Sequence, residues 1–193
     1  MKTLQLNKGR ESSLLRRHPW VFSGAVKGVS ANPEPGETVS ILDASGKAIA
    51  TAAYSPSSQI RARVWSFDTK EVIDEAFFKR RLAAAVARRK ALLNDPQRTG
   101  CRIVYAESDD LPGLIIDRYG DYLVCQFFFV GVEAWKAVIV DLLKELVPCK
   151  GIYERSDAAV RKREGLAPAQ GVLWGEEPPE VIEINEQGRV YGL

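Results

Sequence analysis

The stretch from Glu37 to Phe67, ETVSILDASGKAIATAAYSPSSQIRARVWSF, predicts how the chain begins to fold. Apolar and polar residues alternate in short runs, which is typical of half-buried strands. Turn-forming residues at 35–36 and 43–46 separate these runs. Together with an alternating run at 3–6, the pattern predicts a small β-barrel built from short strands.

The last run, QIRARVWSF, has two chemically different faces. One face is expected to carry Ile60, Ala62, Val64 and Ser66, and the other to present two arginines beside two aromatic residues, Arg61, Arg63, Trp65 and Phe67. Upstream, residues 11–20 (ESSLLRRHPW) predict a short helix that stops before Pro19, because the residue before proline avoids the helical region.

After residue 68 the pattern changes to helical spacing. One long amphipathic helix is predicted from Asp74 to Asn94, where an Asn-Asp-Pro sequence ends it. Its basic residues at 79–81 and 88–90 are expected to cover a solvated face, with direct RNA contact as the alternative. Three strands then follow at 101–129, a second helix has an apolar face, and a strand lies near 151–154. The face of that second helix is expected to hold Ala134, Val138, Leu142 and Leu146. This order predicts a compact α+β unit.

Composition indicates an ordinary globular protein. The 193 residues are 46% hydrophobic and 27% charged, with a net charge of +2. No signal-peptide pattern and no run of about 20 apolar residues is present, so we expect a cytoplasmic protein without a membrane partner. The charge is uneven, because residues 1–67 carry nine Lys and Arg against four acidic residues. The basic part of the chain is therefore its amino-terminal third.

Residue types that carry catalysis are scarce. The three cysteines lack CxxC spacing and have only one histidine as a possible partner, so buried reduced thiols are expected rather than disulfides or a zinc site. No phosphate-binding loop, GxGxxG, HExxH or GxSxG pattern occurs. Four carboxylates flank a Pro-Gly turn and are expected to be solvated rather than catalytic or metal-binding: Glu107, Asp109, Asp110 and Asp117. These observations favour binding over catalysis.

The stretch 8–26, KGRESSLLRRHPWVFSGAV, combines basic and aromatic side chains. Lys and Arg neutralise phosphates, and flat rings stack on unpaired bases. The alternation of Trp20 and Phe22 about Val21 favours a core position for both rings, and His18 either braces the turn at Pro19 or contacts RNA. The candidate RNA-binding residues are Lys8, Arg10, Arg16, Arg17, His18, Trp20, Tyr54, Arg61 and Arg63.

Four blocks in order resemble the amino-terminal half of one family. They are residues 8–26, 52–65 (AAYSPSSQIRARVW), 106–126 (AESDDLPGLIIDRYGDYLVCQ) and 153–166 (YERSDAAVRKREGL). The chain resembles the bacterial 23S rRNA (cytosine-C5) methyltransferases of the large-subunit methyltransferase I type, which begin with a PUA domain. The resemblance implies an α+β fold with a PUA-like β pseudo-barrel at 1–68, a small α+β central domain at 72–185, and the start of a catalytic domain at 186–193.

The same resemblance implies a division of labour. The Rossmann-like domain that binds S-adenosylmethionine is expected to be absent, so this chain is expected to hold no cofactor and to be inactive alone. Large-subunit ribosomal RNA is the implied partner. Gly9 joins the RNA-facing candidates, and a second tier comprises Arg155, Arg161, Lys162 and Arg163.

Two alternatives stay open. The chain could be a freestanding RNA-binding module. It could instead be a protein-interaction module whose central domain forms a homodimer through an apolar patch near 127–130 or on the end strand. The glutamates between 176 and 186 disfavour an RNA surface that extends to the carboxyl terminus.

Overall fold

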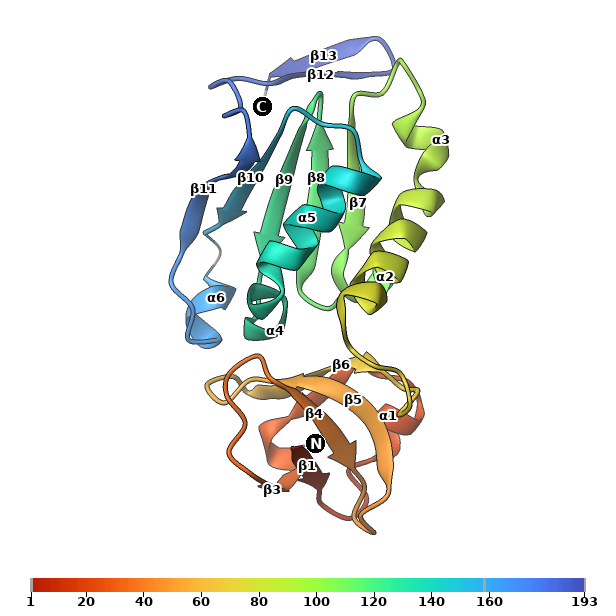
Figure 1. Ribbon diagram of the computed structural model, residues 1–193, viewed down its shortest axis with the longest axis vertical. Coiled ribbons are helices and arrows are strands. Elements are labelled where there is room, and N and C mark those ends of the chain that lie inside the picture. Colours follow the sequence, from red (N-terminus) through yellow and green to blue (C-terminus); the bar gives the residue numbers. More distant parts are fainter. Residues whose placement is uncertain (1, 158, 193) are drawn as a thin grey trace. The chain divides into compact units, whose positions relative to one another are not determined.

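The computed structural model describes residues 2–157 and 159–192 (Figure 1). These residues group into two compact units, each made of several chain segments. The first contains the described residues of Met1–Asp74, Phe128–Trp135 and Ala159–Ala167, and the second contains those of Glu75–Phe127, Lys136–Ala158 and Pro168–Leu193. The contiguous division at residues 68, 72 and 185 stays a prediction, and it differs from this grouping in its assignment of 128–135 and 159–167.

The first unit is built on a six-stranded sheet with the order β2-β6-β5-β4-β1-β3. Strands β1 and β4 pair in parallel, and β4–β5, β5–β6 and β2–β6 pair antiparallel. The strands are β1 (Thr3–Leu6), β2 (Trp20–Phe22), β3 (Val26–Val29), β4 (Thr38–Leu42), β5 (Ala48–Tyr54) and β6 (Ile60–Ser66). A short helix α1 (Ser12–Leu15) and a 3-10 turn η1 (Ser23–Ala25) connect them. The sequence pattern predicted β1, β4, β5 and β6 but did not identify β2 and β3.

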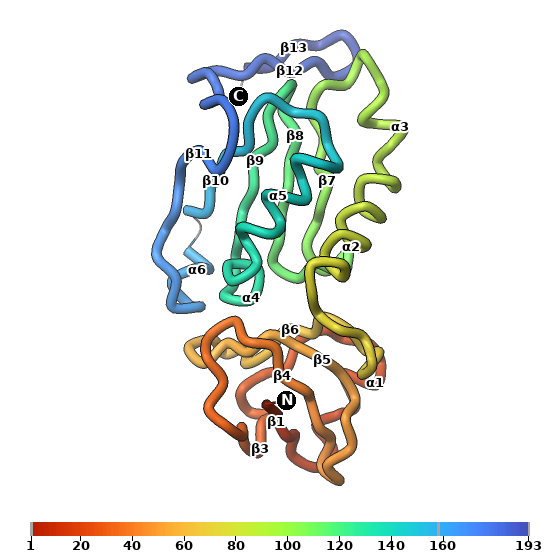
Figure 2. The backbone as a smooth tube through the Cα atoms, viewed as in Figure 1, coloured from red at the N-terminus to blue at the C-terminus, as the bar shows by residue number. Residues whose placement is uncertain are grey.

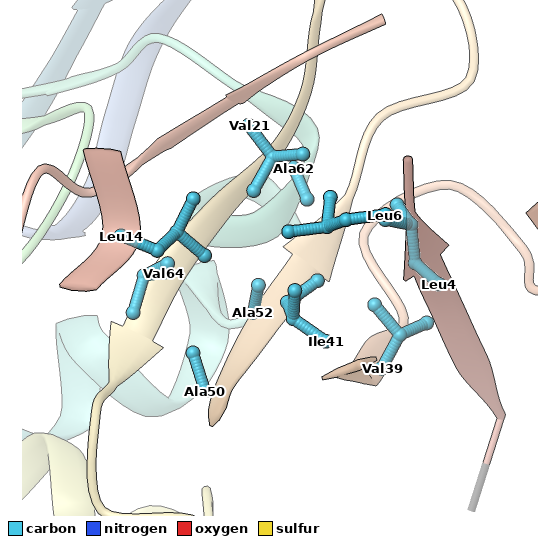
Figure 3. Packing of buried hydrophobic residues seen from close by; sticks show 10 residues of the cluster. All are labelled: Leu4, Leu6, Leu14, Val21, Val39, Ile41, Ala50, Ala52, Ala62 and Val64. Carbon is cyan, nitrogen blue, oxygen red and sulfur yellow. The ribbon is translucent and has the colours of Figure 1, made fainter. Parts of the chain in front are cut away.

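Alternating residues of these strands form the core of the first unit (Figure 3). Leu4 and Leu6 of β1 and Ile41 of β4 are fully buried, and Leu14 of α1 joins them with 3% of its surface exposed. Small side chains on β5 leave room for these larger ones, since Ala50 and Ala52 are also fully buried. The alternation seen in the sequence therefore does specify one buried face.

Two helical segments from later in the chain complete this unit. They are α4 (Val130–Ala134) and α6 (Val160–Arg163). Gly36 has φ +82, and a Cβ there would lie 2.5 Å from the carbonyl oxygen of Val130, so glycine is needed for this turn to approach α4. The rings of Trp65 and Phe129 pack with centroids 5.5 Å apart. The second face of β6, predicted to present Arg63 and Trp65 openly, is therefore covered.

The second unit is built on a five-stranded sheet with the order β11-β10-β9-β8-β7. Its strands are β7 (Gly100–Tyr105), β8 (Leu114–Tyr119), β9 (Tyr122–Phe127), β10 (Gly151–Ser156) and β11 (Ala169–Gly175). A 3-10 turn, η2 (Ala106–Asp109), links β7 and β8, and a hairpin of β12 (Glu183–Glu186) and β13 (Arg189–Gly192) ends the chain. Helices α2 (Glu75–Arg88) and α5 (Lys136–Leu146) lie on one face of the sheet (Figure 1).

Both predicted long helices are interrupted. The first ends at Arg88, and after Arg89 (φ −102, ψ 6) a separate turn, α3 (Lys90–Leu93), follows (Figure 2). The second is split at Trp135, because α4 belongs to the first unit and α5 to the second. As a result the buried residues of α5 are Ile139, Val140, Leu142 and Leu143, and Ala134 is exposed. Of the predicted apolar face, Leu142 is buried and Val138 and Leu146 are half-buried, so the prediction is wrong only for Ala134.

Leu82 on α2 is fully buried, so Leu82→Ala is expected to reduce the free energy of unfolding by about 2–5 kcal/mol. Urea-induced unfolding of the two proteins measures this difference. Ala84→Ser on the exposed side of the same helix serves as the control, and a loss below about 0.5 kcal/mol for Leu82→Ala would contradict the role assigned to it.

Candidate nucleic-acid interface

The basic segment lies on the surface of the first unit. Lys8, Gly9 and Arg10 form the turn after β1, in which Gly9 has φ +81 and the Arg10 N–H donates to the carbonyl of Asn7 at 3.0 Å. All three are exposed, as are Arg16, Arg17 and His18 after α1. Six of the predicted RNA-binding residues are therefore accessible to a large ligand.

Arg17 has an unusual backbone conformation. Its φ is +63, a left-handed value that costs most side chains about 1–2 kcal/mol. The turn closes α1, because the Arg17 N–H donates to Leu14 at 2.8 Å and the His18 N–H donates to Ser13 at 3.0 Å. The guanidinium lies over the Phe67 ring, 5.5 Å from its centroid. Glycine would adopt this left-handed backbone conformation at lower cost. The presence of arginine instead indicates that its side chain has a function.

Three aromatic rings follow this turn in a row. His18 and Trp20 meet edge to face with centroids 5.5 Å apart, and Trp20 and Phe22 do the same at 6.3 Å. The Trp20 N–H donates to Nδ1 of His18 at 3.3 Å, so His18 braces the turn. Trp20 is half-buried, whereas Phe22 is 50% exposed. The expected core position of Phe22 is wrong, because β2 is an edge strand whose inward residue is Val21.

A hollow of about 340 Å³ brings part of this cluster together. It joins the turn after β1 to the start of β2, so that Arg10 and Trp20 line the same depression. Its lining is Gly9, Arg10, Ser12, Ser13, Leu14, Trp20, Val21, Phe22, Gly24 and Ala25. The sequence did not single out the serines or Phe22 as lining residues.

Two of the predicted RNA-facing arginines are buried instead. Arg63 is 6% exposed, and it donates to Oε1 of Glu164 at 2.8 Å and lies over the Phe129 ring, 4.7 Å from the centroid. Arg161 is 3% exposed and donates to Glu133 at 2.8 Å. These placements give both arginines a structural role, so neither is retained in the surface proposed below.

The other candidates lie at intermediate or exposed positions. Tyr54 and Arg61 are half-buried, and Arg61 donates to the carbonyl of Pro56. Lys162 and Arg163 are exposed on α6. In the second unit, the Arg155 side chain is 67% exposed. It lines a hollow of about 390 Å³ on the sheet together with Tyr119, Tyr153 and the segment 177–180.

Three basic residues of α2 and the following Arg89 bind acidic side chains of the second unit. Lys79 pairs with Glu145 at 2.7 Å, and Arg81 pairs with Asp110 at 3.1 Å. Arg88 and Arg89 both bind Asp109, with the shortest contacts at 2.6 and 2.5 Å. These ion pairs favour a structural role for the basic helix over RNA contact.

The acidic residues near the Pro-Gly turn are not all solvated. Asp109 and Asp117 are 1% and 5% exposed, and Asp117 binds Arg102 at 2.8 Å. Burial would raise the pKa of Asp109, but hydrogen bonds from Arg89, Arg88 and the Tyr105 N–H together lower it. A carboxylate held ionised by arginines serves stability and does not act as a general acid. The expectation of a solvated loop is therefore wrong for these two residues.

The cysteines are free thiols. Cys125 is buried, whereas Cys101 and Cys149 are half-buried, and burial raises the pKa of all three. A raised pKa keeps the thiol protonated and unreactive at neutral pH. Among the described residues, no group of three His, Cys, Asp or Glu side chains is placed to hold a metal. No helix in residues 2–157 and 159–192 is long and apolar enough to cross a bilayer.

The predicted apolar patch is only partly present. Phe127 and Phe129 are fully buried and Val130 is 6% exposed, so this segment offers no patch. On the end strand β11, however, Val172 and Trp174 are 42% and 39% exposed.

Residues 4–67 match the family model described as a PUA-like domain. Across 95% of its length the chain is 52% identical to "Ribosomal RNA large subunit methyltransferase I" of Pseudoalteromonas translucida, and it covers 46% of that protein. Proteins of the same name from Aeromonas hydrophila and Klebsiella pneumoniae are 52% and 51% identical, over 97% and 96% of this chain and 47% and 46% of theirs. The chain therefore spans about half the length of these curated relatives.

Solved structures share this fold. "A putative sam-dependent methyltransferase from Streptococcus mutans" aligns over 100% of this chain and 48% of its own, with a TM-score of 0.82 and 21% identity. The structure of a "putative methyltransferase complexed with SAH" aligns over 100% of this chain and 47% of its own, with a TM-score of 0.83 and 21% identity. The first unit is thus a PUA-like β half-barrel within a mixed α/β chain, as the sequence predicted.

Proposed function

We propose that this chain is the RNA-binding and substrate-recognition portion of an S-adenosylmethionine-dependent methyltransferase that modifies cytosine C5 in large-subunit ribosomal RNA. The observation that carries the proposal is the exposed cluster of Lys8, Arg10, Arg16, Arg17 and His18 on a PUA-like domain. About 50% identity to relatives named as ribosomal RNA methyltransferases supports this reading.

The basic cluster has the chemistry of a phosphate-binding surface. Lys and Arg on one surface release counterions from RNA and fix its register, while adjacent rings offer stacking faces. Unlike Lys79, Arg81 and Arg88 on α2, Arg10 and Arg16 form no ion pair with any described residue, so their charge is available to a ligand. The proposed surface of the first unit consists of Lys8, Gly9, Arg10, Arg16, Arg17, His18, Trp20, Tyr54 and Arg61, with Lys162 and Arg163 as secondary contacts. Arg155 of the second unit is proposed as a separate secondary contact.

Methyl transfer itself is not assigned to these residues. S-adenosylmethionine would supply the methyl group, but the chain has no GxGxxG turn between a strand and a helix to hold it. The thiols have raised pKa values, which does not suit a nucleophile that attacks cytosine. The role proposed for this chain is therefore to bind and orient RNA.

Binding to a structured fragment of large-subunit ribosomal RNA across salt concentrations tests the proposal, with a random duplex as competitor. We expect salt-dependent binding that prefers the ribosomal fragment. Equal binding of both RNAs would contradict a role in substrate recognition, and no binding at any salt concentration would contradict the proposed function as a whole.

Self-association is a second candidate, favoured by the exposed Val172 and Trp174 on the edge strand β11. Sedimentation velocity of the parent and of Trp174→Ser distinguishes this possibility. A dimer that dissociates in the variant would support it, and a monomeric parent would exclude it at the concentrations used.

A further inference from the structure

A second hollow in the first unit, of about 650 Å³, differs in chemistry from the basic cluster. Its walls come from three stretches that are distant in sequence: Phe22 at the end of β2, residues 57–60 with Arg63 at the start of β6, and Val160, Arg163 and Glu164 at α6. Its volume falls within the range of about 300–1,000 Å³ that is usual for small-ligand sites. The hollow therefore has room for a nucleotide.

Phe22 supplies an accessible ring at this hollow. The residue is 50% exposed although it is a large aromatic on a strand. The chain turns into η1 directly after it, and its ring contacts Trp20 edge to face at 6.3 Å. An edge-to-face contact covers at most one face of the ring, and the residue is half exposed, so a flat face is left on which a nucleobase can stack.

Glu164 supplies a buried acceptor. The residue is 3% exposed, and its Oε1 accepts a hydrogen bond from Arg63 at 2.8 Å. No group in the described part of the chain donates to Oε2, although this atom is buried as well. A buried carboxylate oxygen is costly to leave without a donor. A ligand with an N–H group would satisfy it.

The backbone after α6 holds Glu164 in position. Gly165 has φ +77, and the Leu166 N–H donates to the carbonyl of Arg161 at 3.0 Å, which closes the helical turn. A Cβ at position 165 would lie 3.1 Å from Oγ of Ser57, so this turn also packs closely against the opposite wall. Glu164 is thus fixed by its Arg63 pair on one side and by this turn on the other.

The charge at the hollow suits RNA. Arg63 compensates the charge of Glu164, and the exposed Arg163 adds a positive charge at the rim. A neutral base edge could then approach the carboxylate while the adjoining phosphate remains near an arginine. Carboxylates accept hydrogen bonds from exocyclic amino groups of bases.

We propose that this hollow is a pocket for one unpaired nucleobase that carries an amino group, stacked on Phe22 and donating to Oε2 of Glu164. Uracil is disfavoured because it has no amino group, and its one Watson–Crick donor, N3–H, is flanked by two carbonyl oxygens that would approach the carboxylate. This inference rests on the proposed RNA-binding function and adds a site that reads a base rather than a phosphate.

The test uses a short RNA hairpin with a single unpaired cytosine, compared with the same hairpin carrying uracil or an abasic nucleotide at that position. The proteins are the parent, Phe22→Leu, which keeps apolar volume but loses the ring, and Phe22→Trp, which keeps a stacking face. We expect Phe22→Leu to weaken binding of the cytosine hairpin by about 5- to 100-fold, the loss expected for one stacked base, with no change in the salt slope. Phe22→Trp is expected to bind like the parent, and the abasic hairpin to bind all three proteins equally.

Glu164→Gln tests the second contact. It is expected to reduce the preference for cytosine over uracil at least fivefold, and thermal unfolding checks that the variant is folded. The inference would be overturned if Phe22→Leu bound the cytosine hairpin as tightly as the parent while loss of Arg16 and Arg17 still weakened binding. In that case the proposed function would stand without the pocket. If the parent bound none of the hairpins, both would fall.

Discussion

The double variant Arg16→Ala with Arg17→Ala is expected to bind ribosomal RNA about 15- to 30-fold more weakly than the parent at about 0.15 M salt. Both arginines are exposed after α1, and each is expected to neutralise one phosphate. Loss of two phosphate contacts lowers the slope of log affinity against log salt by about 1.4 for single-stranded and 1.8 for duplex RNA. Binding titrations at several salt concentrations measure both quantities.

Two comparison variants show whether the loss of RNA binding comes from this surface, from the lower total charge or from a loss of folding. Lys27→Ala with Lys47→Ala removes the same charge from exposed positions on β3 and in the β4–β5 turn, and its salt slope should stay near that of the parent. Arg17→Gly removes one charge while relieving the left-handed backbone at φ +63, so its melting temperature should be unchanged or higher although its RNA affinity falls. Equal loss in both double variants would mean that binding depends on net charge rather than on this surface.

Asp109→Ala is expected to lower the free energy of unfolding by about 3–5 kcal/mol, because it leaves two arginines beside a buried site without their common partner. Asp109 is 1% exposed and binds Arg88 and Arg89, and it also accepts from the Tyr105 N–H at 2.7 Å. Asp141→Ala on the exposed side of α5 should cost no more than about 0.5 kcal/mol. Urea unfolding at neutral pH compares them, and equal losses would contradict the importance of the buried network.

The same carboxylate predicts a pH dependence. The folded state lowers the pKa of Asp109, so the folded protein binds fewer protons than the unfolded chain as acid is added. This contribution is fully present above the unfolded pKa of about 4 and is lost as pH falls through the lower folded value. The stability difference between the parent and Asp109→Ala should therefore shrink below about pH 4. A difference that stays constant down to pH 2 would contradict this assignment.

Local patterns predicted much of the fold. Strands β4, β5 and β6 follow from short runs bounded by turn residues. Buried and half-buried residues alternate on β4, whereas consecutive residues are buried on β5 and β6, which the sequence did not predict. β2 was missed because only three residues pair there, and Phe22 was placed in the core because an edge strand cannot be told from a central one by alternation alone. The break at Trp135 falls where the chain passes from the first unit to the second, which periodicity does not report. The break at Arg89 lies within the second unit, at a residue that binds the buried Asp109.

The candidate site was predictable only at its basic residues. The exposed positions of Lys8, Arg10 and Arg16 could be predicted, because charged residues in a turn-rich segment lie at the surface. Arg63 looked identical in the sequence, yet it is buried because Glu164, about a hundred residues later, offers it a partner. The strongest signal for that pair was an acidic residue within the basic run VRKREGL, and only the fold brings it to β6.

The first unit needs segments that are translated after its β-strands. Its β-strands all leave the ribosome early, but Phe129 and Glu164, which cover Trp65 and Arg63, belong to segments made much later. Until residue 164 has been translated, the nascent chain carries an arginine and a tryptophan on β6 without these intramolecular partners. A fragment ending at residue 74 would keep the basic residues of 8–18 but expose Arg63 and Trp65, so it should be prone to aggregation.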